Sequence, residues 1–256
     1  MKTAWLIFYN LASAAGWAYV LMLALTAFSE GKTPAEAWAA FGDKLMLVQT
    51  TMAFEILHAL TGMVRSPVGV TTMQVSSRLW VVWGATYYCT ACQEHWSLYL
   101  MVVSWCCAEV PRYLFYVANL ALPAIPYPLF YVRYSAFAVL YPTGITGEIF
   151  QCLASLPHWA TACPAWFYAL KVILVLYAPG SPFMIMNMVG NRKSAMKKRN
   201  APPPRKPAGL VWPVTDAKTG ERGSTDTNKK IFEAAIGAVD AAGAEAVRKT
   251  RNWRFG

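Results

Sequence analysis

Long apolar stretches separated by short polar segments fill the first 190 residues of the chain. A helix needs about 20 mostly apolar residues to span the hydrocarbon core of a bilayer. Stretches of this kind occupy residues 4–28, 45–64, 70–92, 96–118, 127–156 and 165–189, and the fifth is long enough that we expect it to be tilted or broken. Only helices and closed barrels satisfy their backbone groups in lipid, and these stretches lack the alternation of barrel strands. The pattern therefore predicts an all-α, polytopic membrane protein with a bundle of six transmembrane helices.

Composition and charge divide the chain into two parts. Hydrophobic residues make up 56% of the 256 residues and charged residues only 14%, whereas a soluble domain carries about a quarter charged residues. Residues 1–190 hold eight Lys/Arg and seven Asp/Glu, and residues 191–256 hold fifteen and six. We therefore predict a membrane domain over residues 1–190 and a basic, largely disordered C-terminal tail over residues 191–256.

Positive charge next to the last apolar stretch predicts the orientation. Cytoplasmic segments next to membrane helices are enriched in Lys and Arg. Such a cluster follows the sixth stretch at once, at Arg192, Lys193, Lys197, Lys198 and Arg199. Six spans then place the N-terminus and the C-terminus together in the cytosol.

The tail itself allows two interpretations. It begins with a proline-rich stretch, which favours an extended chain without a packed core. A weak helical spacing follows at Ile231, Phe232, Ile236 and Val239. The tail is either a solvated segment with one weak helix or carries a surface helix drawn to anionic membrane lipid by Lys229 and Lys230. Neither interpretation indicates nucleic acid.

A few ionisable side chains interrupt the apolar stretches. Such a group in mid-bilayer costs several kcal/mol, so each is a candidate functional residue. The candidates are Glu55, His58, Arg78, Glu109, Arg112, Arg133, Glu148 and Lys171. Each can also belong to a structural network of buried ion pairs.

The sequence gives little support for a metal or a redox cofactor. Glu55-x-x-His58 is half of a carboxylate-bridged di-metal site, but there is no second such motif and only three histidines occur in all. Cys89-x-x-Cys92 has no second pair to complete a zinc site. No Gly-x-Gly-x-x-Gly motif follows a strand. We therefore predict chemistry that needs neither a metal nor another cofactor.

One spacing is typical of tyrosine phosphatases. Cys106 and Arg112 are separated by five residues, but these contain no glycine and include the acidic Glu109. A phosphatase needs a loop whose backbone N–H groups surround the phosphate, and an acid there repels it. We interpret the spacing as a coincidence.

The segment from residue 133 to residue 148 is the most informative. Tyr141 and Glu148 are seven residues apart, which in a helix puts them on one face about 10 Å apart along the axis. They are too distant to bond each other, but they can flank a reacting C–C unit. Pro142, Gly144 and Gly147 can loosen the intervening turn and adjust the gap. The alternative is a kinked helix whose buried Glu148 pairs with a distant base.

An ordered set of polar motifs resembles a known family. The motifs are Glu55-x-x-His58, Gly62, Val64-Arg65-Ser66-Pro67, Thr72-x-Gln74-Val75-x-Ser77-Arg78, Trp83, Glu109-x-x-Arg112-Tyr113, Arg133-Tyr134 and Leu140-Tyr141-Pro142-x-Gly144-x-x-x-Glu148. Over roughly residues 1–190 the chain resembles the very-long-chain (3R)-3-hydroxyacyl-CoA dehydratases, also called protein-tyrosine-phosphatase-like A proteins. Ala138 and Pro111 depart from the residues we expect in this family, which leaves pocket shape and chain-length preference open.

The resemblance implies an enzyme, a hydro-lyase that dehydrates a very-long-chain (3R)-3-hydroxyacyl-CoA to the trans-2-enoyl-CoA in fatty-acid elongation. It implies catalysis by Tyr141 and Glu148 without a metal, in the endoplasmic reticulum membrane, beside elongase and reductase subunits. It leaves open which of the two residues removes the proton from carbon 2.

The remaining candidates are assigned around this reaction. We expect substrate-binding arginines for the CoA phosphates at Arg65, Arg78, Arg112 and Arg133, and a structural polar network at Glu55, His58 and Glu109. Some of the arginines can instead pair with Glu55 or Glu109. The alternative functions are a non-catalytic membrane scaffold of the elongation complex and a small-solute transporter, although no internal repeat supports the transporter.

Overall fold

The described part of the chain, residues 1–200 of a computed structural model, is entirely helical. The helices are α1 (Lys2–Ser29), α2 (Pro34–Thr51), α3 (Ala53–Leu60), α4 (Val68–Leu79), the π-helix η1 (Trp80–Thr86), α5 (Thr90–Gln93), α6 (Ser97–Ala121), α7 (Tyr127–Ser135), α8 (Phe137–Ala162) and α9 (Pro164–Asn200). The chain divides into two units after Met196, and the fold described below is that of the first. The predicted proline-rich stretch and tail helix lie outside the described residues.

The expected number of single membrane-spanning helices is corrected by the structure. Among residues 1–200, three helices are each long and apolar enough to cross a membrane, namely α1, α6 and α9. The second predicted stretch is divided between α2 and α3, the third among α4, η1 and α5, and the fifth between α7 and α8. The predicted number of six single spanning helices is therefore wrong, and the fifth stretch, which we expected to be tilted or broken, is divided between α7 and α8. Hydropathy alone does not register the breaks in the second and third stretches.

The widened turn of η1 in the third stretch has a local cause. In η1, the carbonyl oxygen of Gly84 accepts a hydrogen bond of 3.0 Å from Trp166 Nε1. A Cβ atom at Gly84 would lie 2.6 Å from the Trp166 ring. That ring also stacks on Trp80, with 3.9 Å between the centroids. Because π-helical turns often accommodate such inserted contacts, we attribute the widened turn of η1 to the seating of Trp166 from α9.

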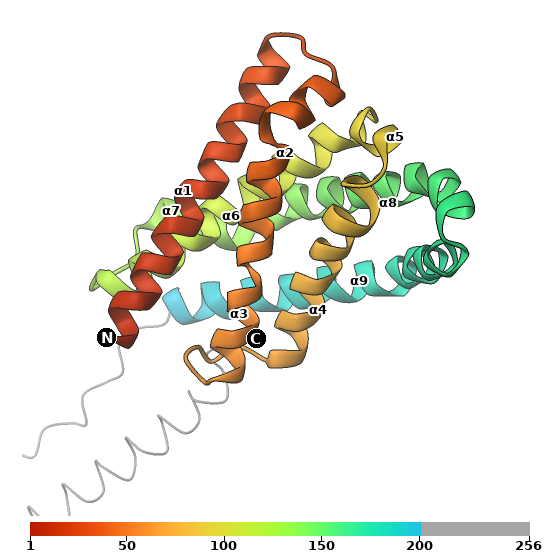
Figure 1. Cartoon of the computed structure of the whole chain (residues 1–256). Helices are drawn as coiled ribbons and strands as arrows, with labels where there is room; N and C mark the ends of the chain where they lie inside the picture. Colours follow the sequence, from red (N-terminus) through yellow and green to blue (C-terminus); the bar gives the residue numbers. More distant parts are fainter. Residues whose placement is uncertain (201–256) are drawn as a thin grey trace, which may run out of the picture. The chain divides into compact units, whose positions relative to one another are not determined.

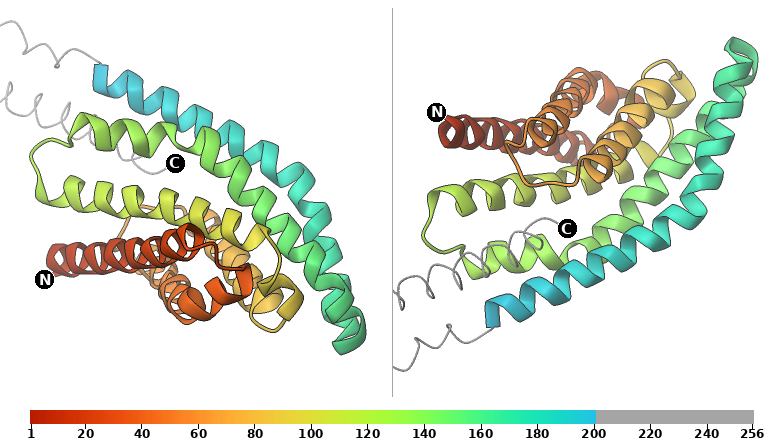
Figure 2. Two further views of the ribbon diagram at one scale, coloured as in Figure 1. Left: turned by 90° about the horizontal axis from the view of Figure 1, so that it is seen from above. Right: turned by 90° about the horizontal axis from the view of Figure 1, so that it is seen from below.

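The helices pack around α6 (Figure 1). The main contacts of α6 are with α1 on one side and with α8 on the other, and α2 packs against α1. The two views in Figure 2 show α9 running side by side with α8. The largest fully buried side chains include Trp17, Phe41, Trp105 and Tyr113. The core therefore lies where α1, α2 and α6 meet, and α8 closes it on the side that carries Glu148.

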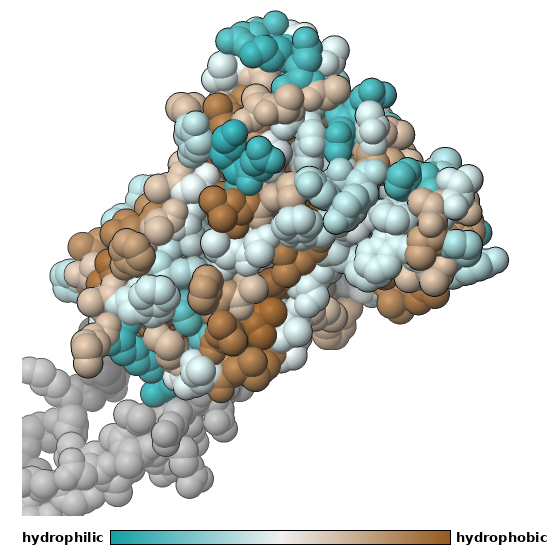
Figure 3. All heavy atoms as spheres, viewed as in Figure 1, coloured by the Kyte–Doolittle hydropathy of each residue, from teal (hydrophilic) through white to brown (hydrophobic). Residues whose placement is uncertain are grey.

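Helix α9 contributes little to this core. Of its 37 residues, only Leu170 and Met184 are buried, and large apolar side chains such as Val175, Phe183 and Met186 are exposed. On the face of the molecule seen in Figure 3, the most hydrophilic residues gather over the turn between α1 and α2, and an apolar patch lies lower on the same face. Exposed apolar surface on this scale is typical of a protein in contact with lipid.

The start of α2 shows how a polar end is built. Thr33 is the N-cap, Pro34 occupies the first turn, and the Glu36 carboxylate accepts hydrogen bonds of 2.8 Å from the Thr33 backbone N–H and hydroxyl. This is a capping box, which satisfies free N–H groups at a helix start. The Thr33 backbone N–H holds the pKa of the Glu36 carboxyl below its usual value, with a smaller effect of the Thr33 hydroxyl.

Candidate active site

Glu148 is a buried carboxylate held by two neutral donors. It lies on α8 with 8% of its surface exposed. Trp105 Nε1, from α6, donates a hydrogen bond of 2.8 Å to Glu148 Oε1. The Tyr177 hydroxyl, from α9, donates one of 2.6 Å to Oε2. Three helices therefore converge on one carboxyl group.

A glycine next to Glu148 allows this convergence. A Cβ atom at Gly147 would lie 2.7 Å from the backbone nitrogen of Met101, so α8 and α6 approach too closely there for any side chain. At Gly144, one turn earlier, the nearest atom would be Ser104 Cβ at 3.7 Å, an ordinary contact. The helix is continuous through this segment. Gly147 therefore serves close packing, which differs from the loosened turn that the sequence suggested.

Tyr141 lies on the same helix as Glu148, seven residues before it. Its side chain is half-buried, and it interacts electrostatically with Glu148 and with Arg78. Within residues 1–200 its hydroxyl has no hydrogen bond. A phenol that is near a buried carboxylate but not bonded to a protein group remains available to a ligand.

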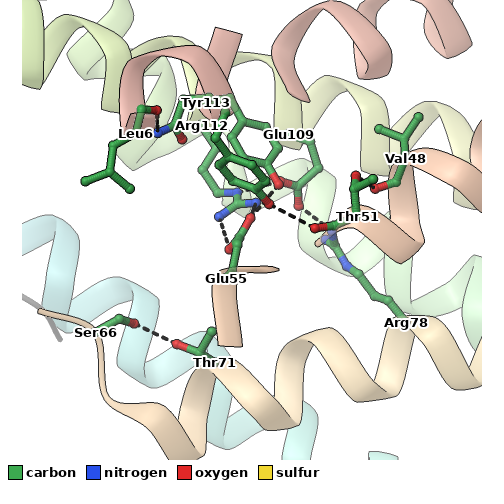
Figure 4. Close-up of polar contacts among 12 residues, drawn as sticks. Leu6, Val48, Thr51, Glu55, Ser66, Thr71, Arg78, Glu109, Arg112 and Tyr113 are labelled. Atoms are coloured by element: carbon green, nitrogen blue, oxygen red, sulfur yellow. Dashed lines mark hydrogen bonds and ion pairs between the residues drawn. The ribbon is translucent and has the colours of Figure 1, made fainter. Parts of the chain in front are cut away.

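Two glutamates and two arginines form a second polar group, which we call the arginine–glutamate cluster: Glu55, Arg78, Glu109 and Arg112 (Figure 4). Arg112 binds Glu55 through both terminal nitrogens, at 2.9 and 2.6 Å, and Nε of Arg112 donates to Glu109. Arg78 forms an ion pair with the other oxygen of Glu109. Both carboxylates are therefore neutralised by guanidinium groups, as buried charges require.

Tyrosine and tryptophan side chains surround the cluster. The Tyr113 hydroxyl donates to Glu55, and the Arg112 guanidinium carbon lies 4.2 Å from the centroid of the Tyr113 ring. The Arg78 guanidinium carbon lies 5.1 Å from the ring centroid of Trp105. Because Trp105 also binds Glu148, Arg78 connects the cluster to the Glu148 site through one shared aromatic ring.

His58 lies at the edge of this region. Its Nε2 accepts a hydrogen bond of 2.9 Å from Trp5 Nε1, and its ring meets that of Tyr9 edge to face at 4.9 Å. The structure thus places His58 against aromatic residues of α1, although Glu55 lies three residues before it on α3. In residues 1–200 no group of three or more His, Cys, Asp or Glu side chains has the arrangement of a metal site.

The remaining two candidate arginines form no ion pair with these groups within residues 1–200. Arg65 is exposed, and no polar partner contacts it within residues 1–200. Arg133, at the end of α7, is half-buried, and its guanidinium carbon lies 5.9 Å from the ring centroid of Tyr116 and 5.8 Å from that of Tyr134. Arg192 of α9 donates to the Ser135 hydroxyl at 3.1 Å, so a further guanidinium lies at the same end of α7.

The cysteine of the phosphatase-like spacing is part of a helix. Cys106 is fully buried in α6, whose helix continues through Arg112 and Pro111. The backbone N–H groups of a helix interior already bond within the helix, so they cannot surround a phosphate. Arg112 is bound to carboxylates as well. The segment therefore does not form a phosphate-binding loop.

Sequence reasoning missed two residues of the Glu148 site, Trp105 and Tyr177. It ranked side chains by charge, and neither of these carries one. A usable signal was available, because tryptophan and tyrosine need a partner for their polar group when buried. This rule would have identified Trp105 and Tyr177 as potential hydrogen-bond donors, but it would not have identified Glu148 as their acceptor.

Comparisons with known proteins give a consistent result. The family model described as protein tyrosine phosphatase-like protein, PTPLA, matches residues 49–198. The very-long-chain (3R)-3-hydroxyacyl-CoA dehydratase PASTICCINO 2 of Arabidopsis thaliana is 39% identical over 211 residues, covering 77% of this chain and 95% of the relative. The dehydratase hpo-8 of Caenorhabditis elegans is 33% identical, covering 75% and 94%, and dehydratase 2 of Homo sapiens is 30% identical, covering 77% and 82%. No solved structure matches the chain.

Proposed function

The chain belongs to the protein tyrosine phosphatase-like family PTPLA, and we propose that it dehydrates very-long-chain (3R)-3-hydroxyacyl-CoA to trans-2-enoyl-CoA, a hydro-lyase step of fatty-acid elongation. The relatives with this name support the substrate and the reaction. The observation that carries the mechanism is the buried Glu148 carboxylate, which is bound by neutral donors and shares a helix with Tyr141, whose hydroxyl has no hydrogen bond to residues 1–200.

The reaction needs a base at carbon 2 and an acid at the 3-hydroxyl. In the proposed allocation, Glu148 takes the proton from carbon 2, next to the thioester carbonyl. The C3–O bond breaks, and Tyr141 donates its proton to the departing hydroxide, so that water leaves. Protonated Glu148 and the tyrosinate then return to their starting states through solvent. Each positioned group contributes about 10²–10⁴-fold in rate. The opposite allocation of the two residues is the alternative.

Separate cations serve the CoA portion in this proposal. Arg133 lies eight residues before Tyr141, about 12 Å along the axis of α7 and α8. The pantetheine arm contains two amide units and extends like about four residues of extended chain, on the order of 14 Å. A thioester near Tyr141 therefore puts the CoA phosphates within reach of Arg133. Arg192 and the exposed Arg65 are further guanidinium groups among the described residues.

Arg78 and Arg112 take a different role from that of phosphate ligands. Both are bound to Glu109, and Arg112 also binds Glu55 at both oxygens. Releasing Arg112 to a phosphate would leave the partly buried Glu55 without its ion-pair partner, and releasing Arg78 would remove one of the two guanidinium partners of the buried Glu109. Both losses are unfavourable. These contacts favour pairing with Glu55 and Glu109, one of the two roles that the sequence allowed.

The proposed location is the membrane of the endoplasmic reticulum, with both termini in the cytosol and elongase and reductase subunits as partners. The three helices that can cross a membrane singly support a membrane protein. The pairs α2–α3, α4–η1 and α7–α8 complete the crossings in this proposal. Each pair is nearly continuous, with at most one residue between its two parts.

Replacing Tyr141 by phenylalanine tests the proposal. The variant keeps the ring and removes the hydroxyl, and it is compared with the unchanged protein as purified enzyme with a long-chain (3R)-3-hydroxyacyl-CoA. We expect turnover to trans-2-enoyl-CoA, measured by chromatography of the products, to fall by about 10²-fold or more. Turnover near the original value would remove Tyr141 from the chemistry. Absence of enoyl product with the unchanged protein would favour the scaffold.

A further inference from the structure

The environment of Glu148 differs from that of the partly buried Glu55 in α3 and of the buried Glu109 in α6. No Lys or Arg within residues 1–200 forms an ion pair with Glu148. Its two oxygens are occupied by one neutral donor each, Trp105 at Oε1 and Tyr177 at Oε2. An ionised carboxylate has about four lone-pair sites, so each oxygen keeps one for a substrate.

Tyr177 reaches Glu148 from a helix that is anchored on both sides of it. Toward the start of α9, Trp166 donates to the carbonyl of Gly84 at 3.0 Å. Toward its end, Arg192 donates to the Ser135 hydroxyl at 3.1 Å. Tyr177 lies between these two attachments, and α9 buries few side chains otherwise. The position of its hydroxyl is therefore fixed by contacts at a distance from the chemistry.

We propose that Tyr177 is a positioning residue for the dehydration, which with Trp105 holds the Glu148 carboxylate in one orientation toward carbon 2 of the substrate. This inference rests on the proposed function. A glutamate has three side-chain torsions, and fixing them with permanent hydrogen bonds removes freedom that would otherwise be lost in the transition state. A misplacement of about 1 Å at a reacting group can cost about 10²-fold in rate.

A purely structural role is the competing explanation. The bond between Tyr177 and Glu148 also connects α9 to α8, so its loss could weaken the fold and leave the chemistry intact. The two roles differ in what they change. A structural role changes the yield and the unfolding temperature, whereas a positioning role changes kcat of the folded enzyme.

The test uses Tyr177→Phe in the full chain, purified in detergent and supplied with a long-chain (3R)-3-hydroxyacyl-CoA. We expect kcat to fall by about 10–100-fold with KM changed by less than about twofold, because the hydroxyl orients the base and does not bind the substrate. Tyr168→Phe is the matched control. It lies on the same helix, is exposed, and should leave both constants unchanged.

A rescue and a double variant sharpen the result. Inserting p-aminophenylalanine at position 177 restores a donor on the same ring, and kcat should recover by at least about fivefold over Tyr177→Phe. In a Glu148→Gln background, Tyr177→Phe should cost less than about twofold, because residues acting as a unit are not additive.

Three results would overturn the positioning role: an unchanged kcat in folded Tyr177→Phe, a variant that simply fails to fold, or a full additional loss in the Glu148→Gln background. The same assay separates this inference from the proposed function. If Tyr141→Phe and Glu148→Gln keep their turnover, the acid–base proposal fails. If they lose it while Tyr177→Phe does not, only the positioning role fails.

Discussion

The two polar sites among the described helices differ in the groups that bind their carboxylates, which are charged in one site and neutral in the other. In the arginine–glutamate cluster, Glu55 and Glu109 are neutralised by Arg112 and Arg78. At the other site, Glu148 has no donors within residues 1–200 other than Trp105 and Tyr177. Glu55 is bound by one guanidinium group and Glu109 by two, so a loss of charge at either carboxylate would leave a guanidinium group without a charged partner. A carboxyl group that is bound by neutral donors can gain and lose a proton without that cost.

The difference suggests that, in an apolar helix bundle, one group of charged residues can stabilise the fold while a separate carboxyl group serves the reaction. Arg78 lies at the boundary, because it binds Glu109 and covers the ring of Trp105. The cluster can therefore set the orientation of a donor to Glu148 without placing a cation on Glu148 itself. Changes in the two sites should have separable effects, and the predictions below test that separation.

The largest expected effect is on turnover. Glu148→Gln keeps the size of the side chain and removes the group that exchanges a proton. We expect turnover to fall by about 10²–10⁴-fold, with an unfolding temperature in detergent close to that of the unchanged protein. The measurement is product formation from a long-chain 3-hydroxyacyl-CoA together with a thermal unfolding curve. A variant that kept its turnover and had a clearly lowered unfolding temperature would instead assign Glu148 a structural role.

The next effect is on stability. Arg112→Met leaves Glu55 without its ion-pair partner, and removing one member of a buried pair typically costs about 3–5 kcal/mol. We therefore expect a large fall in the unfolding temperature of the purified protein. Arg112 is chosen over Arg78 because Arg78 also contacts Trp105.

A double variant provides the control for the cluster. Glu55→Met together with Arg112→Met removes both charges, so it should recover part of the lost stability. If Arg112→Met instead kept its stability and raised the KM for acyl-CoA, Arg112 would be a substrate ligand, which is the other role that the sequence allowed.

The sequence predicted the candidates of both sites better than it predicted their arrangement. Charge in an apolar stretch was enough to single out Glu148 and the four members of the cluster. Their pairing depends on contacts between helices far apart in the chain, such as Arg112 with Glu55, which residue spacing does not encode. Family resemblance supplied the pairing of Tyr141 with Glu148, which spacing alone left open.

The helical class was also predictable, but the breaks in the helices were not. Length and hydropathy predicted helices throughout residues 1–190, and the described residues contain helices and no strands. The π-helix at Trp80–Thr86 depends on the ring of Trp166, a residue more than 80 positions later. A pattern within one segment cannot register such a contact. Only the fifth stretch was therefore expected to be tilted or broken, whereas the structure also divides the second and the third.

A smaller effect comes from the spacing of α6 and α8. Gly147→Ala would put a Cβ atom 2.7 Å from the Met101 backbone nitrogen, which cannot move aside as a side chain can. We expect a loss of about 1–3 kcal/mol in stability, as for other overpacked sites, and a fall in turnover because Glu148 is displaced from Trp105. Gly144→Ala is the matched control, with its nearest contact at 3.7 Å, and it should change neither quantity much. Equal effects of the two variants would mean that close packing at Gly147 does not position Glu148.

The smallest effect concerns an exposed carboxylate that has neutral donors like those of Glu148. Glu36 accepts from the backbone N–H and the hydroxyl of Thr33, and the backbone N–H is the larger cause of its lowered pKa. A carboxyl whose pKa is lowered on folding stabilises the fold above its unfolded pKa, and this contribution is lost as pH falls through the folded pKa.

Thr33→Ala removes the side-chain cap of α2, so we expect the unfolding temperature at pH 7 to fall by roughly 2 °C. The difference should narrow as pH falls below the usual pKa of 4.5 and through the lower pKa of folded Glu36, because the Thr33 hydroxyl then no longer bonds a charged carboxylate. The backbone N–H of residue 33, the larger cause of the lowered pKa, is present in both proteins. Turnover should not change at pH 7. The Thr33 hydroxyl binds an exposed carboxylate at the start of α2, and Glu36 is more than 100 residues away from Glu148 in the sequence. A large loss of turnover in Thr33→Ala would instead mean that the two ends of the fold are coupled, and that a carboxylate's donors alone do not distinguish a catalytic site from a helix cap.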